Sequence, residues 1–217
     1  MSIFDTIKKT IFGDENQEET ENRHTTHDHT HYERNTAEDD HQHDAYIASL
    51  LAEREEKDDF FANNPYHSPL AQKDLYNFKG LNYYDPNLAY QYVLQLRSSE
   101  PETVTFETST GQEQPYERIG TVHFEVEQQP AQLAIYQSPD GHLFLPFRDA
   151  TSGNETYGAG RYLEPIPLGN DELLVDFNRA YNPYCAYSEA YSCPLPPIEN
   201  WLRVPIRAGE RAYKENH

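Results

Sequence analysis

The sequence predicts a mainly β fold, α+β at most, in which an antiparallel β-sandwich or barrel carries one N-terminal helix. Short segments rich in β-branched and aromatic residues follow one another between residues 80 and 149. Turn signals such as Pro139–Gly141 separate them. Beyond residue 177 the chain becomes rich in proline. We therefore expect a long Pro-rich C-terminal coil packed on the sheet, because it cannot form a core of its own.

The first expected element is a short amphipathic segment at residues 1–13. Its apolar residues fall at helical spacing, opposite Lys8 and Lys9, and Gly13 is a natural end: Ile3, Phe4, Ile7, Ile11 and Phe12. Such a short helix is not stable alone in water. Two interpretations remain open. The segment from Ile3 to Phe12 docks on a partner protein or a membrane surface, or it folds back on its own domain or frays.

Residues 14–44 are acidic and His-rich, and they predict a disordered linker. Three His-x-His pairs in this stretch could bind transition metals only adventitiously, because a selective site needs a fixed geometry. We therefore predict no metal site there.

A single folded domain is expected over residues 45–217. It begins with a helix from about Ala45 to Phe61, and the prolines in residues 64–69 end that helix. The expected strands cover residues 80–99, 103–110, 116–127, 131–138, 142–149 and 173–177.

Composition excludes several classes of protein. The net charge of −20, with scattered basic residues, argues against a nucleic-acid partner. The chain has no apolar run of about 18 residues that would predict a transmembrane segment, and no signal-peptide pattern at its start. A cytoplasmic location is therefore expected. Two cysteines cannot define a disulfide framework in 217 residues.

The C-terminal motifs between His142 and Glu210 hold the candidate site, since charged residues there sit among glycines, prolines and tyrosines. Arg148 and Arg161 would grip the charge of a small anionic ligand, and Asp176 and Asn178 would orient it. Three tyrosines would form the walls of the pocket: Tyr157, Tyr162 and Tyr181. The glycine spacing matches neither a P-loop nor a dinucleotide-binding fingerprint. No cofactor is indicated.

Other interpretations of these residues stay open. Arg148 and Asp149, or Arg161 and Asp176, could pair with each other and hold loops in place, and the Asn and Asp residues before prolines could close turns.

An enzyme could also use the region, with Asp149 or Asp176 as acid/base and Cys185 as nucleophile. The spacing of Cys185 and Cys193 is not that of a zinc knuckle, and the two thiols could be a reactive or redox pair, or simply pack in the core. A third possibility is a scaffold or interaction protein tethered through residues 1–13.

The longest motifs resemble one known family. FRDATSGNETYGAGRYL and LLVDFNRAYNPYCAYSEAYSCPLPPIENWLRVPIRAGE, preceded by FFANNPYHSPL and FKGLNYY, resemble domain-of-unknown-function family 1684 of bacteria and archaea over about residues 45–210. The resemblance implies no established activity, substrate or cofactor. Tyr184 stands where the family pattern has a second proline and Trp201 where it has arginine, so a ligand role of that arginine would not carry over.

Overall fold

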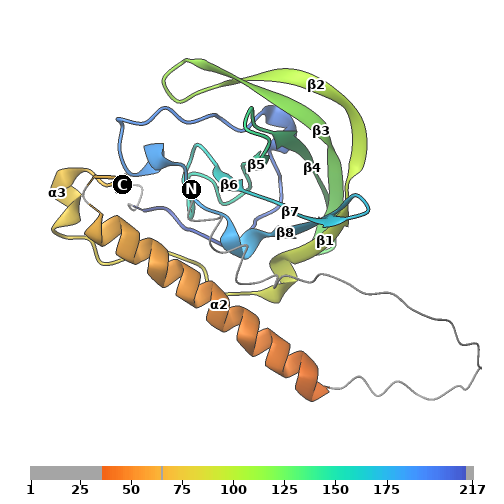
Figure 1. Ribbon diagram of the computed structural model, residues 1–217, viewed down its shortest axis with the longest axis horizontal. Helices are drawn as coiled ribbons and strands as arrows, with labels where there is room; N and C mark the ends of the chain where they lie inside the picture. Colours follow the sequence, from red (N-terminus) through yellow and green to blue (C-terminus); the bar gives the residue numbers. More distant parts are fainter. Residues whose placement is uncertain (1–35, 65, 214–217) are drawn as a thin grey trace, which may run out of the picture. The chain divides into compact units, whose positions relative to one another are not determined.

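A computed structural model describes residues 36–64 and 66–213 (Figure 1). The segment 1–13 and the linker up to residue 35 lie outside the described residues. The helices are α2 (Thr36–Asn63), α3 (Gln72–Leu75) and the 3-10 helices η1 (Leu88–Tyr90), η2 (Phe177–Arg179), η3 (Tyr184–Ala186) and η4 (Ile198–Asn200). The strands are β1 (Gln91–Gln95), β2 (Arg97–Glu107), β3 (Glu113–Val126), β4 (Gln129–Gln137), β5 (Leu143–Phe147), β6 (Arg161–Leu163), β7 (Ile166–Gly169) and β8 (Glu172–Asp176).

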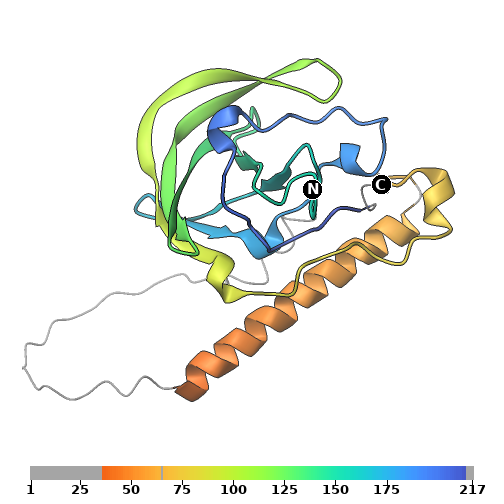
Figure 2. The ribbon, with the colours of Figure 1, turned by 180° about the vertical axis from the view of Figure 1, so that it is seen from behind.

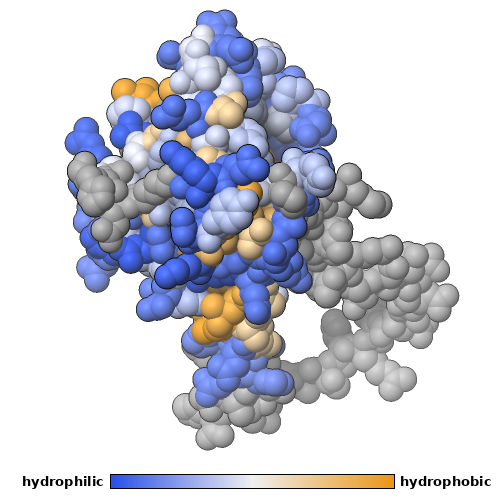
Figure 3. Space-filling model, turned by 90° about the vertical axis from the view of Figure 1, so that its left-hand side faces the viewer, coloured by the Kyte–Doolittle hydropathy of each residue, from blue (hydrophilic) through white to orange (hydrophobic). Residues whose placement is uncertain are grey.

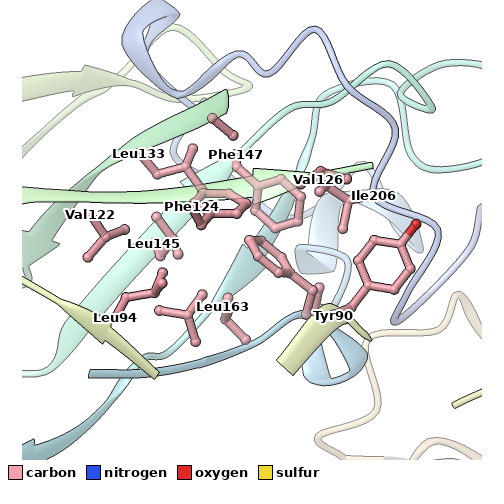
Figure 4. Packing of buried hydrophobic residues seen from close by; sticks show 14 of the residues in the cluster. Tyr90, Leu94, Val122, Phe124, Val126, Leu133, Leu145, Phe147, Leu163 and Ile206 are labelled. Carbon is pink, nitrogen blue, oxygen red and sulfur yellow. The ribbon is translucent and has the colours of Figure 1, made fainter. Parts of the chain in front are cut away.

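The strands form two antiparallel sheets. One has five strands in the order β2-β3-β4-β5-β6, and the other has three in the order β1-β8-β7. The sheets do not close into a barrel, so that alternative is wrong. Both contribute to one hydrophobic core (Figure 4), in which Leu94 of β1 and Val175 of β8 share a cluster with Val122, Leu133 and Leu145 of the larger sheet. The mainly β prediction is confirmed, with a sandwich-like arrangement.

The prediction of one strand over residues 80–99 is wrong. The Asn87 side chain accepts a hydrogen bond from the Ala89 backbone and caps η1, so extended pairing starts only at Gln91. β1 and β2 then belong to different sheets, although a single residue separates them. Two short strands, β6 and β7, were missed because they lie among glycines and prolines without alternation.

Helix α2 begins at Thr36, about nine residues before the predicted start, so residues 36–44, which we assigned to the linker, are helical. Those residues are polar on all sides and show no apolar period, and this explains the error. The helix lies outside the sheets on the side of β8 and η2 (Figure 2). Leu50 and Phe61 are buried, and Arg179 pairs with Glu53 at 2.6 Å.

Candidate functional site

Arg161 at the start of β6 lies in the protein interior, with 1% of its surface exposed. Its guanidinium donates to the backbone carbonyls of Ile206 at 2.8 Å, Glu210 at 3.1 Å and Ala208. The Asp149 carboxylate is 3.5 Å away. Burial lowers the pKa of Arg161, and the Asp149 charge opposes that shift. The predicted anion-binding arginine is therefore occupied by the chain itself, and a ligand could reach it only if residues 206–210 moved.

Asp149 is also occupied by internal donors. Its carboxylate accepts hydrogen bonds from the Thr151 hydroxyl at 2.9 Å and from the Ile206 backbone N–H. The predicted pairing of Arg161 with Asp176 does not form, because Arg161 pairs with Asp149 instead.

Asp176 and Asn178 connect helix α2 to the sheets. Asp176 caps η2 through the Asn178 backbone N–H at 3.1 Å, and it accepts from the Tyr46 hydroxyl at 2.8 Å. Arg179 lies 3.5 Å from the same carboxylate. Asn178 exchanges hydrogen bonds with the Asn87 backbone, at 2.9 Å in each direction. Burial, and then the Asp176 charge, raises the pKa of Tyr46. These contacts hold the helix in place.

The remaining predicted ligand residues are not gathered around one cavity. Tyr162 donates to the Pro194 carbonyl, and Tyr181 donates to Glu164 at 3.1 Å. Arg148 is half-buried, with its guanidinium 4.2 Å from the centre of the Trp201 ring. Among the described residues Arg148 makes no ion pair. Tyr157 points to Cys185 instead.

A hollow of about 290 Å³ lies at the β3–β4 side of the larger sheet. It is lined by Thr103, Pro115, Tyr116, Glu117, Gln137, Ser138, Pro139 and Gly141. None of the predicted ligand residues lines it. On the face shown in Figure 3, hydrophobic side chains form small separate patches among hydrophilic ones.

The two cysteines lie together as free thiols. The backbone N–H of Cys185 donates to the sulfur of Cys193 at 3.3 Å. The Tyr157 hydroxyl is 3.6 Å from the Cys185 sulfur. Cys185 is half-buried and Cys193 is 8% exposed, so solvent reaches the first more readily than the second. Tyr157 and Cys185, both predicted site residues, are in direct side-chain contact here.

The surroundings of the two thiols separate their acidities. The pKa of Cys185 is lowered to about 6, first by a hydrogen bond from the Cys193 thiol and further by Tyr157 and Ser109, against the effect of burial. The pKa of Cys193 is raised, because its thiol bonds to the Cys185 sulfur and because it is buried. Of the two thiols, Cys185 therefore ionises more readily, and Cys193 stays protonated to higher pH.

Backbone pairing carries Cys193 to this position. Ser109, just after β2, donates its N–H to the Cys193 carbonyl at 2.8 Å, and its hydroxyl accepts the Cys193 N–H at 3.1 Å. Leu195 donates to the Glu107 carbonyl at 2.8 Å, which extends the pairing. Cys185 comes from η3, which starts after Pro183. The sequence identified both cysteines as candidates, but Ser109 was missed because only this long-range pairing brings it near.

A buried carboxylate was also missed. Glu210 is 1% exposed and accepts from Lys57, from the Tyr187 hydroxyl at 2.6 Å and from the Asn182 backbone at 2.8 Å. Its partners come from two distant segments, α2 and residues 182–187, so no local motif indicates it. Through Lys57 it holds α2, as Asp176 does through Tyr46 nearer the start of the helix.

No cluster of three or more His, Cys, Asp or Glu side chains in residues 36–64 and 66–213 could hold a metal ion. Within the same residues, no helix has the length and apolar character needed to cross a membrane.

Comparison with known proteins places the chain in a family. A family model described as protein of unknown function DUF1684 matches residues 76–211. The solution NMR structure of an uncharacterised protein of Haloarcula marismortui is similar, with 38% identity and a TM-score of 0.63, and the match covers 79% of this chain and 97% of that one. No curated protein matches. The resemblance predicted from the C-terminal motifs is confirmed: the chain belongs to the DUF1684 family of proteins of unknown function.

Proposed function

We propose that Cys185 and Cys193 form a thiol–disulfide exchange site, in which Cys185 attacks a substrate disulfide and Cys193 resolves the intermediate. The observation that carries the proposal is that the free thiols of Cys185 and Cys193 lie close together. The Cys193 sulfur is 3.3 Å from the Cys185 backbone nitrogen, and the Tyr157 hydroxyl is 3.6 Å from the Cys185 sulfur.

The chemistry follows from the two acidities. A thiol with a pKa of about 6 is about nine-tenths thiolate at neutral pH, and the thiolate is the attacking form. The Cys185 thiolate attacks one sulfur of a substrate disulfide, forms a mixed disulfide, and releases the other substrate sulfur as a thiolate. Tyr157 can donate a hydrogen bond to Cys185 while it carries the charge.

Cys193 completes the reaction. It loses its proton to the released thiolate, and its own thiolate attacks the Cys185 sulfur. The Cys185–Cys193 disulfide forms and the second substrate thiolate leaves. The substrate disulfide gains two electrons and the protein dithiol loses two, so the balance needs no further reactant. The raised pKa of Cys193 keeps it protonated until the mixed disulfide has formed. In the expected cytoplasmic location, cellular thiols would return the pair to the dithiol.

The other candidate functions have less support. A pocket for a small anionic ligand would rely on Arg161, which is taken up by three carbonyls. Acid/base catalysis would rely on Asp149 or Asp176, and both accept hydrogen bonds from buried groups. Tethering through residues 1–13 concerns residues outside the structure and stays a prediction.

The test treats the reduced full chain with hydroxyethyl disulfide, an uncharged reagent, and follows the intact mass and the remaining thiols. We expect the wild-type protein to lose two hydrogens and keep no adduct. Cys193→Ser should stop at one hydroxyethylthio adduct on Cys185. Cys185→Ser is the matched control and should stay largely unmodified, because Cys193 is buried.

Stable adducts on the wild-type protein without an internal disulfide would contradict the proposal. So would equal reaction rates of the two serine variants, since they would show that Cys185 is not the attacking thiol.

A further inference from the structure

We infer that the substrate of the thiol pair is a small disulfide or thiol carrying a carboxylate, which binds Arg148 on the face of Trp201. This inference rests on the proposed exchange function and names its substrate class. It starts from the Arg148 guanidinium, which stands in contrast to three others: among the described residues Arg161, Arg179 and Arg207 each pair with a carboxylate. Arg148 is half-buried and makes no such pair in the same part of the chain.

Arg148 lies beside the segments that carry the thiol site. A Cβ atom placed on Gly160 would be 2.7 Å from the Pro196 Cγ and 3.0 Å from the Arg148 Cγ. The stem of Arg148 therefore packs where these two segments meet. Gly160 follows Tyr157 by three residues, and its N–H donates to the Tyr157 carbonyl at 3.1 Å. Pro196 follows Cys193 by three residues. Three residues span at most about 11 Å, so Arg148 is within the reach of a small molecule bound at the thiols.

The chemistry of this arginine favours a carboxylate. The Trp201 ring, 48% exposed, covers one face of the guanidinium, and the edge keeps N–H donors that match a carboxylate in a bidentate pair. The chain as a whole carries a net charge of −20, which repels anions. The Arg148 guanidinium, which has no carboxylate partner among the described residues, therefore offers a local attraction for anions that the net charge otherwise repels.

The experiment compares two aromatic disulfides with the full-length protein. Dithiobis-nitrobenzoate carries a carboxylate on each ring, and dithiodipyridine is neutral. Rates of reaction of Cys185 are measured for the wild type, for Arg148→Gln, and for Arg97→Gln as a matched control. Arg97 is exposed at the opposite end of β2, ten residues from Glu107, or about 30 Å of strand from the Cys193 pairing. Both variants lose one positive charge.

We expect Arg148→Gln to lower the ratio of the anionic to the neutral rate about threefold or more, as a unit charge at about 6 Å in water would. Arg97→Gln should leave the ratio nearly unchanged. An unchanged ratio in Arg148→Gln would overturn the inference while leaving the exchange function intact. Failure of the wild-type Cys185 to react with either reagent would instead overturn the exchange function.

A second measurement does not depend on the variants folding. If attraction to Arg148 dominates, added potassium chloride lowers the wild-type rate with dithiobis-nitrobenzoate and leaves the dithiodipyridine rate unchanged. If repulsion by the net charge dominates, salt raises the anionic rate, and the inference is wrong.

Discussion

The interior network around Arg161 and the surface region that holds Arg148, Tyr157 and Cys185 are built from the same C-terminal motifs. They differ in how the hydrogen-bonding groups of their arginines are satisfied. Arg161 is directly across the strand pair from Phe147, the residue before Arg148. The Arg161 guanidinium donates to three backbone carbonyls in the interior and lies beside the Asp149 carboxylate. The Arg148 guanidinium lies against the half-exposed Trp201, and among the described residues it pairs with no carboxylate. The comparison shows that two arginines of one motif can differ in whether the chain itself satisfies their hydrogen bonds, and only an unsatisfied guanidinium is available to a ligand.

Replacing Arg161 by methionine should lower the free energy of unfolding more than any other substitution proposed here. A small effect would contradict the contrast between the two arginines. The substitution keeps the side-chain volume but leaves Asp149 and three carbonyls buried without their donor. We expect a loss of about 3–5 kcal/mol in the free energy of unfolding. Urea denaturation monitored by Trp201 fluorescence measures it.

Arg97→Ala is the control for that experiment and should stay within about 0.5 kcal/mol of the wild type, because Arg97 is exposed. Equal effects of the two substitutions would show that the Arg161 network contributes no stability.

Glu210→Gln should have an intermediate effect. The amide removes the charge that Lys57 and the Tyr187 hydroxyl bind, and it offers donors to groups that already donate. We expect a loss of about 2 kcal/mol in the free energy of unfolding. Glu56→Gln, on the exposed face of α2, is the control and should change the stability little. An equal change in both would mean that the buried carboxylate holds α2 no better than a surface residue.

The smallest expected effect is a shift in the pKa of Cys185, which tests the contact between Tyr157 and Cys185. The rate of reaction with a neutral disulfide should rise with pH through a midpoint near 6, since the thiolate attacks and its pKa is lowered to about 6. Tyr157→Phe removes one hydrogen-bond donor to the thiolate, so the midpoint should move to higher pH. The measurement is the rate profile between about pH 5 and 9, the range that brackets shifted and ordinary thiol acidities. A midpoint unmoved by Tyr157→Phe would remove Tyr157 from the site.

The fold was predictable where the local pattern decides it. Strands over residues 116–127 and 131–138 alternate or run apolar, and β3 and β4 form there. β6 and β7 are held by pairing with β5 and β8 rather than by their own pattern, so they could not be predicted. The start of α2 was missed for a related reason, because its first residues have no apolar face.

The site could be predicted only as a set of residue types. The motifs indicated Arg148, Tyr157 and Cys185, but Arg161 came from the same motifs and lies in the interior. Which arginine is buried depends on where residues 206–210 pack against the sheet, because their carbonyls bind Arg161. That is a contact between segments about 45 residues apart, which sequence spacing does not reveal.

Gly160 lies between Arg148 and Pro196, directly before Arg161, and leaves no room for a side chain. Its backbone φ is +106°, and a Cβ would be 2.7 Å from the Phe147 carbonyl as well as against Arg148 and Pro196. Any side chain there would clash with the Phe147 backbone of β5, with Pro196 and with the stem of Arg148. In a saturation library selected separately for folding and for thiol reactivity, Gly160 is therefore a residue at which both selections should keep glycine.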